Sequence, residues 1–387
     1  MDNFADYIFG GFNDTMDASL DEAGSYSPPE SAFARFGVSY NRVHGYLSVT
    51  VCIFGIVSNV LSIIVLTRKH MRSPTNFILT ALAIADILVM STYPIMAIYF
   101  YIITSPGCMT AQHSRGWINF ILFHLLFIVT CHNMAMWLTV TLAIFRYIFV
   151  CQHAIAARMC CLARAKLAVA VVVVAAIVSC LPLYFVYSVQ DNGSGLNRNV
   201  SCYSIVASQL AQDNPTYTQF VRWLFGVVFK ILPCVLMAFF STLLIIAMQQ
   251  VKKRRARLFN KVTRIVDPDH KSNEHNRTTM MLLAVVICFI VTEIPQGILV
   301  LIWAVDEGFF NDVYIHLGDL MDMLVLVNSA VNFILYCIMS QHFRSTFKSL
   351  FVCNNIPFNL HRINLHRKVA KADGTELCMV KTETTNV

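Results

Sequence analysis

Charged residues are scarce in this sequence. Only 13% of its 387 residues are Asp, Glu, Lys or Arg, whereas a soluble globular protein carries about 25%. Hydrophobic residues make up 57% of the chain, and the mean hydropathy is +0.60. This composition excludes an ordinary soluble domain and predicts an integral membrane protein, for which counting domains by length does not apply.

The sequence patterns of catalytic and metal sites are also missing. No His-Glu-x-x-His pattern, nucleophile elbow or paired-aspartate motif occurs, and none of the 13 cysteines forms a Cys-x-x-Cys pair. His113 and His153 stand in predicted loops without companion residues. We therefore expect no enzymatic activity and no resident cofactor, and nothing in the sequence indicates a nucleic-acid partner.

Seven apolar runs are long enough for a helix to cross the hydrocarbon core of a bilayer, which takes about 20 residues. The fourth run contains a stretch, residues 167–187, that carries no charge at all. The sequence therefore predicts an all-α membrane protein, a bundle of seven transmembrane helices. We expect its spans at residues 44–67, 75–103, 117–150, 166–188, 220–249, 279–304 and 314–339.

Basic residues predict which side of the membrane the loops face, because cytoplasmic loops carry an excess of Lys and Arg. The loop after span one begins with Arg68 and Lys69, and the loop after span five holds the basic run Lys252–Arg257. Residues 1–43 hold seven acids and two bases. We expect a multi-pass plasma-membrane protein with an extracellular N-terminus and a cytoplasmic C-terminus. No signal peptide is evident, so the first span is expected to direct insertion.

The predicted outer loops carry candidate sites of covalent modification. Two cysteines, Cys108 and Cys202, lie clearly outside, and an oxidising compartment would join them in a disulfide. The alternative is that one of them stays free or pairs with Cys180, near the outer end of span four. Glycosylation sequons begin at three outer positions, Asn13, Asn192 and Asn199.

Several motifs occur in the order and spacing of a known family. They are Gly55-Ile-Val-Ser-Asn59, Leu-Ala-Ile-Ala-Asp86, Phe145-Arg146-Tyr147, Pro233, Phe289 with Pro295, and Asn328-Ser-Ala-Val-Asn332-Phe-Ile-Leu-Tyr336. Over residues 44–352 the chain resembles the rhodopsin-type G-protein-coupled receptors. The resemblance implies a receptor that couples an extracellular messenger to a heterotrimeric G protein and then to arrestin.

Three departures from the common pattern narrow this resemblance. Phe145 replaces the acid before the span-three arginine, Phe333 replaces the proline of span seven, and Glu293 replaces the tryptophan of span six. Together with Thr-Glu-Ile-Pro-Gln-Gly at 292–297, they resemble the invertebrate myosuppressin and FMRFamide-like peptide receptors. The resemblance implies a short peptide ending in Arg-Phe-amide and signalling through inhibitory G proteins. The similar receptors for myoinhibitory and sex peptides are the alternative, and a channel or transporter is a remote one.

One glutamate and one lysine interrupt the apolar spans. Glu293 lies two residues before Pro295, and Lys230 lies three residues before Pro233, which sets similar depths in adjacent helices of the resembled fold. An ionisable group inside a membrane is costly and marks a functional site. We expect a Lys230–Glu293 ion pair near the floor of the ligand cavity. The alternative is a protonated Glu293 that donates a hydrogen bond to His132 or to water.

The acids near the predicted outer end of span seven suit a cationic ligand, because a guanidinium pairs bidentately with carboxylate. Span three has no acid between Trp117 and Arg146, which argues against an amine ligand, and span seven has no lysine for retinal. Asp319 and Asp322, three residues apart on one helical face, are expected to bind the peptide arginine or, alternatively, to cap the helix. The other expected ligand contacts are Glu293, Lys230, His124, Gln296 and Tyr99.

The resemblance also assigns roles to polar residues of the inner half. Asp86 would lie in a polar cluster that repacks on activation and that can hold a sodium ion, although Ala135 replaces a common serine ligand. Arg146 would meet the G protein, and with Phe145 beside it we expect its usual local ion pair to be absent. The full set of expected switch residues is Arg146, Tyr147, Asp86, Asn328, Asn332, Tyr336, Phe289, Pro295 and Pro233.

The segment after span seven resembles a short amphipathic helix that lies on the inner leaflet. Cys353 is a palmitoylation candidate, threonines of the polar and unstructured tail are candidate phosphorylation sites for arrestin, and Lys252–Arg257 would bind anionic lipid. The expected organisation is an extracellular tail (1–43), the seven-helix bundle (44–340), the surface helix (341–352) and a cytoplasmic tail (353–387).

Overall fold

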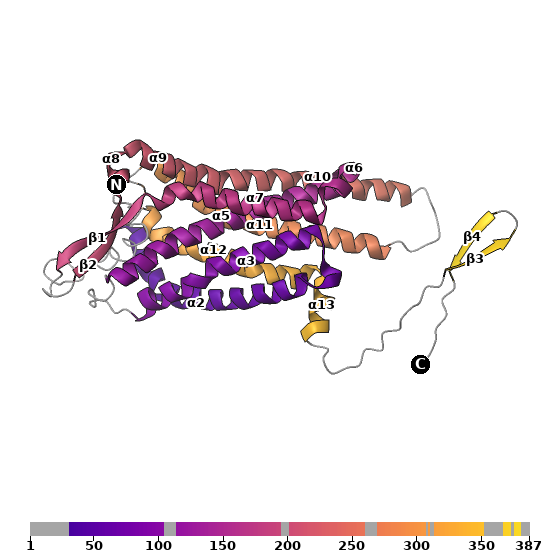
Figure 1. Ribbon diagram of the computed structural model, residues 1–387, viewed down its shortest axis with the longest axis horizontal. Helices are drawn as coiled ribbons and strands as arrows, with labels where there is room; N and C mark the ends of the chain where they lie inside the picture. The colour runs from indigo at the N-terminus through magenta and orange to yellow at the C-terminus, as the bar shows by residue number, and fades with distance from the viewer. Residues whose placement is uncertain are drawn as a thin grey trace. The chain divides into compact units, whose positions relative to one another are not determined.

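The computed structural model describes residues 31–103, 114–194, 201–259, 269–306, 309, 313–351, 367–372 and 375–380. The chain divides into two compact units, Met1–Arg344 and Ser345–Val387. Within the described residues, seven helices are long and apolar enough to cross a membrane, as the sequence predicts. In the first unit these helices lie side by side as a bundle (Figure 1).

The seven spans are built from eight α-helices and two π-helical segments. Span one is α2 (Ala32–Leu66), span two is α3 (Pro74–Ala97) with the π-helix η2 (Ile98–Ile103), span three is α5 (Arg115–Cys151), and span four is α7 (Leu162–Tyr184). Span five runs through α9 (Pro215–Trp223), the π-helix η3 (Leu224–Ile231) and α10 (Leu232–Phe259). Spans six and seven are α11 (Asp269–Val305) and α12 (Ile315–Met339).

Shorter elements connect the spans. They are the 3₁₀ turn η1 (Lys69–Met71), α6 (His153–Met159), the strands β1 (Tyr187–Ser194) and β2 (Ser201–Ala207), and α8 (Gln209–Asp213). The helix α13 (Gln341–Phe351) follows the last span. The antiparallel β1–β2 hairpin lies with α8 at one end of the bundle (Figure 1). Span four was expected to run to residue 188, but α7 ends at Tyr184 and β1 follows almost at once.

The first helix begins earlier than expected. We assigned residues 1–43 to the extracellular tail, but α2 starts at Ala32, where Ser31 Oγ accepts a hydrogen bond from the backbone N–H of Ala34 at 3.0 Å. Residues 32–43 extend the helix beyond the apolar run and pack on α12. A Cβ on Gly37 would lie 3.2 Å from the carbonyl oxygen of His316. The polar side chains within residues 32–43 interrupt the apolar pattern, so a search based on hydropathy does not find this part of the helix.

The second unit contains the end of α13, from Ser345, and a small hairpin. Strands β3 (Arg367–Ala372) and β4 (Thr375–Val380) pair antiparallel, with Arg367 opposite Val380 and Ala372 opposite Thr375. The sequence predicted an unstructured tail here, so this hairpin corrects that expectation. The helix α13 itself lies within the range expected for the surface helix.

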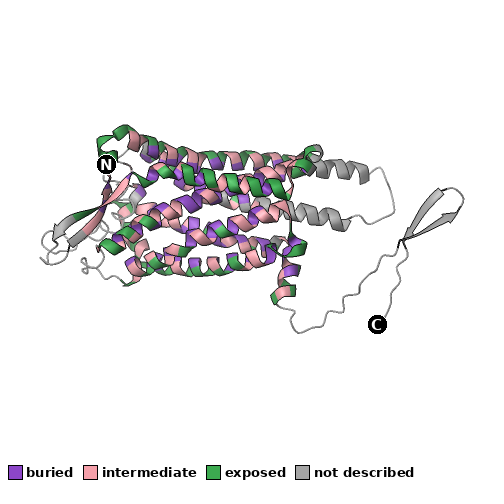
Figure 2. Ribbon diagram, viewed as in Figure 1, coloured by how far each residue is buried: buried purple, intermediate pink, exposed green. Residues whose placement is uncertain are grey.

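Buried and exposed residues follow the pattern expected for a bundle in lipid. Figure 2 shows buried residues on the inward faces of the helices and exposed residues on the outward faces. In α7, the large apolar residues Leu167, Val171, Val174 and Val178 are all more than half exposed and recur at helical spacing. This apolar outward face is what hydrocarbon requires, and it makes α7 the most lipid-exposed span.

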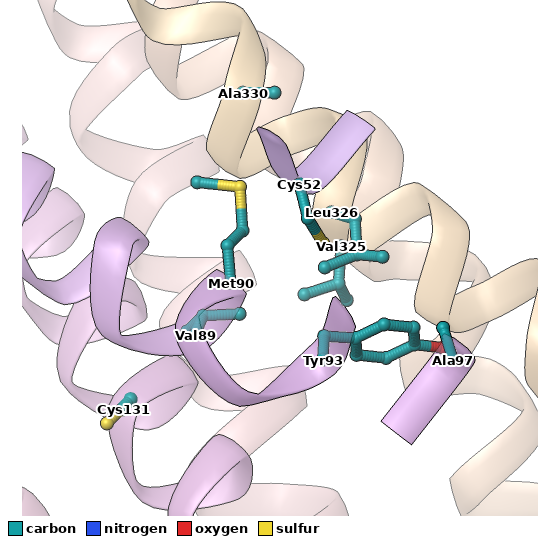
Figure 3. Packing of buried hydrophobic residues seen from close by; sticks show 9 residues of the cluster. All are labelled: Cys52, Val89, Met90, Tyr93, Ala97, Cys131, Val325, Leu326 and Ala330. Atoms are coloured by element: carbon teal, nitrogen blue, oxygen red, sulfur yellow. The ribbon is translucent and has the colours of Figure 1, made fainter. Parts of the chain in front are cut away.

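A close contact between α2 and α3 depends on glycine. The core there is formed by Cys52, Val89, Met90, Tyr93, Ala97, Cys131, Val325, Leu326 and Ala330 (Figure 3). A Cβ built on Gly55 would collide with the thioether sulfur of Met90 and would lie 3.1 Å from the Cβ of Ala330. Small residues at helix crossings allow this approach in membrane bundles.

Replacing Gly55 with valine should therefore destabilise the helix bundle. Overpacking a tight core costs about 1–3 kcal/mol, so the variant should melt at a lower temperature in detergent, as measured by a thermal shift assay. Gly116→Val is the matched control, because a Cβ there meets nothing within 4 Å. Equal melting temperatures for the two variants would show that the Gly55 contact is unimportant.

Candidate ligand and signalling sites

Four polar side chains form a charged cluster in the middle of the bundle. Glu293 Oε2 accepts hydrogen bonds from Lys230 Nζ at 2.9 Å and from His132 Nε2 at 3.0 Å. Lys230 Nζ also donates to Gln296 Oε1 at 2.6 Å. The predicted Lys230–Glu293 pair is therefore present, and His132, proposed as the alternative partner, contacts the same oxygen.

The charged cluster (His132, Lys230, Glu293 and Gln296) joins three spans. His132 comes from α5, Lys230 from η3, and Glu293 and Gln296 from α11. Glu293 is 0% exposed and Lys230 is 3% exposed, so both charges are removed from water. Because an unpaired charge at this depth is costly, each residue holds the other in place.

Backbone features of spans five and six bring these side chains together. Pro233 has no N–H to bond the carbonyl of Phe229, and the π-helix η3, which contains Lys230, lies directly before this point. Such π turns often occur at functional sites. On the facing helix, a Cβ on Gly297 would lie 3.0 Å from Ile231 Cδ1, so glycine lets α11 approach η3 closely.

The two acids expected to bind a ligand arginine are held by tyrosines. Asp319 Oδ1 accepts a hydrogen bond from Tyr101 Oη at 2.7 Å, and Asp322 Oδ2 accepts one from Tyr93 Oη at 3.3 Å. His44 Nε2 lies 3.0 Å from Tyr93 Oη, and its ring packs on Tyr101 at 4.9 Å between centroids. We call Asp319 and Asp322 the acidic pair; it lies where α2, α3 with η2, and α12 meet.

Sequence reasoning missed the three residues that frame the acidic pair. Tyr93, Tyr101 and His44 lie within spans that read as apolar, and one aromatic among many gives little signal. Their spacing does contain a hint, because Tyr93 and Tyr101 are eight residues apart, which is about two helical turns. The role of the acids as simple helix caps does not fit these contacts, because both carboxylates bond across helices.

The helix α5 passes both the acidic pair and the charged cluster. His132 of the charged cluster follows His124 by eight residues, about two helical turns, on α5. His124, another expected ligand contact, packs edge-on against Tyr93 at 5.6 Å, and its Nδ1 lies 2.7 Å from Thr92 Oγ1. The structure thus brings most of the expected ligand residues into one region of the bundle.

Tyr99 is the exception among these residues. Its ring stacks on Trp117 with centroids 3.5 Å apart, and it packs with Phe100 and Ile118 in the apolar cluster that meets strand β2 at Ile205. This environment supports the hairpin more directly than it supports the acidic pair. Three further acids lie between spans six and seven in the sequence. Asp306 is exposed, while residues 307 and 312 lie outside the described part of the chain.

Asp86 anchors a polar cluster between spans one, two and seven, as the resemblance predicts. Its Oδ2 accepts a hydrogen bond from Asn332 Nδ2 at 2.8 Å. Asn59 Nδ2 donates to the carbonyl oxygens of Gly55 at 2.9 Å and Ser329 at 2.8 Å. These bonds tie α2, α3 and α12 together.

Several buried polar atoms of this cluster have no hydrogen-bond partner among the described residues. They are Asp86 Oδ1, Asn59 Oδ1 and both polar side-chain atoms of Asn328. A buried carboxylate oxygen without a donor fits a cation ligand, whereas Ala135 offers no side-chain oxygen. Asp86 is thus the residue that would hold a sodium ion.

Arg146 lies near the C-terminal end of α5, without an ion pair in the part of the chain that the structure describes. The residue is 5% exposed, and its Nε and Nη2 atoms have no hydrogen-bond partner there. This agrees with the expectation drawn from Phe145. Arg146 lines a small cavity with Leu142, Ala143, Phe240, Ser241, Leu244 and Val286, on α5, α10 and α11.

The remaining switch residues lie within the spans. Tyr147 packs on Phe240 at 5.9 Å, and the buried Tyr336 packs on Phe343 at 5.5 Å. Pro295 is inside α11, and the side chain of Phe289 is not among those described.

The predicted modification sites fall mostly outside the described residues. Cys108, Asn13, Asn199 and Cys353 lie there, and for Asn192 and Cys202 only the backbone, in β1 and β2, is described. Cys180 is a buried free thiol whose sulfur accepts a hydrogen bond from Asn133 Nδ2 at 3.7 Å. The alternative pairing of Cys202 with Cys180 is therefore wrong.

Comparisons with known proteins identify the family. The family described as "Serpentine type 7TM GPCR chemoreceptor Srw" matches residues 46–354. The chain is 31% identical over 352 residues to the G-protein coupled receptor dmsr-1 of Caenorhabditis elegans, which covers 81% of this chain and 69% of that relative. The chain is a member of this family of G-protein-coupled receptors. Members of the family are receptors and not enzymes, and this receptor is a multi-pass membrane protein.

Two further relatives support the narrower resemblance. The Sex peptide receptor of Drosophila melanogaster is 30% identical to this receptor, with 80% of this chain and 72% of the relative covered. The FMRFamide receptor of the same organism is 26% identical, with 80% of this chain and 54% of the relative covered. The resemblance inferred from Phe-Arg-Tyr and Thr-Glu-Ile-Pro-Gln-Gly is confirmed.

The charged cluster yields a prediction about stability. Lys230→Met should leave the charge of Glu293 buried with His132 as its remaining partner and should cost up to about 3–5 kcal/mol, seen as a lower melting temperature of the purified receptor. The double variant Lys230→Met/Glu293→Met removes both charges and should recover much of that loss. Additive losses in the single and double variants would contradict the pairing.

The cavity at Arg146 yields a prediction about basal activity. Val286→Glu should place a carboxylate opposite the unpaired guanidinium and tie α11 to α5, which should lower ligand-independent G-protein activation, normalised to surface expression. Val286→Gln, which has a similar size and no charge, is the control. The idea is wrong if the two variants reduce basal nucleotide exchange equally.

Proposed function

We propose that this receptor is activated by a short amidated peptide ending in Arg-Phe-amide and that it signals through a heterotrimeric G protein of the inhibitory class. Two of the relatives are named as receptors for peptides, FMRFamide and sex peptide. The observation that carries the proposal is the acidic pair, which presents two neighbouring carboxylates framed by aromatic rings.

The chemistry of the acidic pair fits an arginine side chain. A planar guanidinium has five N–H donors and can bond two carboxylate oxygens at once. The rings of Tyr93, Tyr101 and His44 line the same place and can stack on its flat face. The compact ammonium group of a lysine has no planar face, so it would match the two carboxylates and the aromatic rings less well than a guanidinium. We therefore assign Asp319 and Asp322 to the peptide arginine.

The ligand enters from the extracellular side in this proposal. The acidic N-terminal segment faces outward, and the basic run Lys252–Arg257 and the C-terminus face the cytoplasm, where anionic lipid, the G protein and arrestin meet the receptor. Arg146 is the contact for the G protein once α11 moves away from α5. A sodium ion at Asp86 would favour the inactive arrangement by filling its unpaired acceptor.

A second ligand class has a specific observation in its favour. Identity to the Sex peptide receptor, at 30%, is higher than the 26% to the FMRFamide receptor. Peptides of the myoinhibitory type, which end in Trp-amide, lack the arginine that the acidic pair would bind. A channel or transporter is disfavoured because the chain belongs to a receptor family.

A peptide panel tests the proposal directly. Cells that express the receptor should respond to peptides ending in Arg-Phe-amide with a fall in cyclic AMP, and this fall should be blocked by pertussis toxin. A response to Trp-amide peptides alone would show that the ligand belongs to the myoinhibitory class and that the Arg-Phe-amide assignment is wrong. Purified receptor in liposomes should pass no ions.

The acidic pair should control peptide potency. Asp322→Asn and Asp319→Asn each remove one charge from the arginine site and should raise the half-maximal concentration of an Arg-Phe-amide peptide by about 10- to 100-fold, equivalent to about 1.4–2.8 kcal/mol. Asp213→Asn, at an exposed acid of α8, should change it little. If a peptide with citrulline in place of arginine is affected as strongly as the arginine peptide, the assigned contact is wrong.

A further inference from the structure

One hydrogen-bond acceptor of the charged cluster receives no hydrogen bond from the other members of the cluster. Lys230 and His132 both contact Glu293 through the same oxygen, Oε2. The other oxygen, Glu293 Oε1, is buried and has no hydrogen-bond partner among the described residues. A buried carboxylate oxygen without a donor is costly, and the cost falls when a ligand supplies an N–H.

The charge balance of the cluster decides which kind of ligand group can approach. Lys230 already directs two of its three donors to Glu293 and Gln296. Its positive charge is balanced by Glu293 at 2.9 Å. A neutral donor can therefore bind Oε1, whereas a second carboxylate would bring an unbalanced negative charge into a site removed from water.

We infer that Glu293 recognises the terminal amide of the peptide, with Oε1 accepting an amide N–H, and that its charge excludes peptides ending in a free acid. This inference rests on the proposed function and deepens it. A primary amide has two N–H donors and no charge, whereas a C-terminal carboxylate has neither an N–H nor neutrality. The charged cluster is thus the specificity site for the amide end.

The position of the cluster suits the short distance between the two ends of an Arg-Phe-amide tail. Tyr93, which bonds Asp322 of the acidic pair, packs on His124 of α5, and His132 of the charged cluster follows His124 by about two helical turns on the same helix. The arginine and the terminal amide are separated by a single residue, phenylalanine. Apolar side chains of η3 and α11, including Phe225, Phe229 and Val300, pack together beside the cluster and offer surroundings for that ring.

Binding at Oε1 also has a consequence for the helices. Because this oxygen is covered in the structure, the amide can reach it only when the cluster rearranges. His132, Lys230 and Glu293 belong to α5, η3 and α11, so rearrangement changes how these spans contact one another. Recognition of the amide and the first step of activation are then the same event.

The test compares an amidated peptide with its free-acid form on the same receptor variant. The readout is the ratio of their half-maximal concentrations, which is independent of expression level when both are measured in one cell line. The unmodified receptor should prefer the amide by about 100-fold or more. Glu293→Gln removes the charge and keeps the shape, so the acid form should gain potency and the ratio should fall by about tenfold or more.

Two further variants complete the design. Asp322→Asn is the matched control, because it weakens the arginine contact and should shift both peptides alike without changing the ratio. Lys230→Gln/Glu293→Gln removes both charges and avoids an unpaired lysine, and it should also lower the ratio. It serves as the test variant if Glu293→Gln fails to reach the cell surface.

The outcomes separate the two proposals. A ratio in the Glu293→Gln and double variants equal to that of the unmodified receptor overturns the assignment of Glu293 and leaves the peptide class intact. A ratio that falls equally in Asp322→Asn also overturns it, because the effect would then be general. An unmodified receptor that ignores both peptide forms overturns the proposed function and this inference together.

Discussion

The ion pair between Lys230 and Glu293 is the constraint around which the bundle is organised. Neither charge is tolerated alone in hydrocarbon, so η3 and α11 must present them at the same depth and within bonding distance. Gly297 lets the two helices come close enough, and His132 extends the contact to α5. One glutamate side chain therefore holds three of the seven spans together. It occupies the position at which rhodopsin-type receptors commonly have a tryptophan.

Because of this arrangement, single helices carry residues of more than one functional site of the receptor. The helix α5 carries His124 beside the acidic pair, His132 in the charged cluster and Arg146 at the inner cavity. The helix α12 carries the acidic pair at one end and Asn332, bonded to Asp86, further along. A ligand that changes the outer contacts acts on rigid elements that also hold the inner ones, which is the physical requirement for coupling distant sites.

Sequence reasoning succeeded where a residue type is improbable in its surroundings. Seven long apolar runs predict helices that cross a membrane. Lys230 and Glu293 could be identified because charged residues are rare in such runs. It failed where the surroundings hide the signal. Tyr93, Tyr101 and His44 resemble ordinary members of apolar spans, and their role depends on Asp319 and Asp322, which lie more than 200 positions away. The early start of α2 and the two hairpins could not be predicted from the sequence, because polar helical turns and short strands have no distinctive hydropathy.

The π-helix η3 has a consequence for how this site could have arisen and how easily it could be lost. A π turn holds more residues than an α turn, so the segment contains surplus chain relative to a regular helix. Removing a single residue between 224 and 229 would let the segment relax to α-helix, and because the π turn had absorbed the extra residue, the helices on either side would keep their relative phase. The side chains inside the segment would take new positions, so a one-codon deletion would change which residues lie beside Lys230 while leaving the membrane topology untouched.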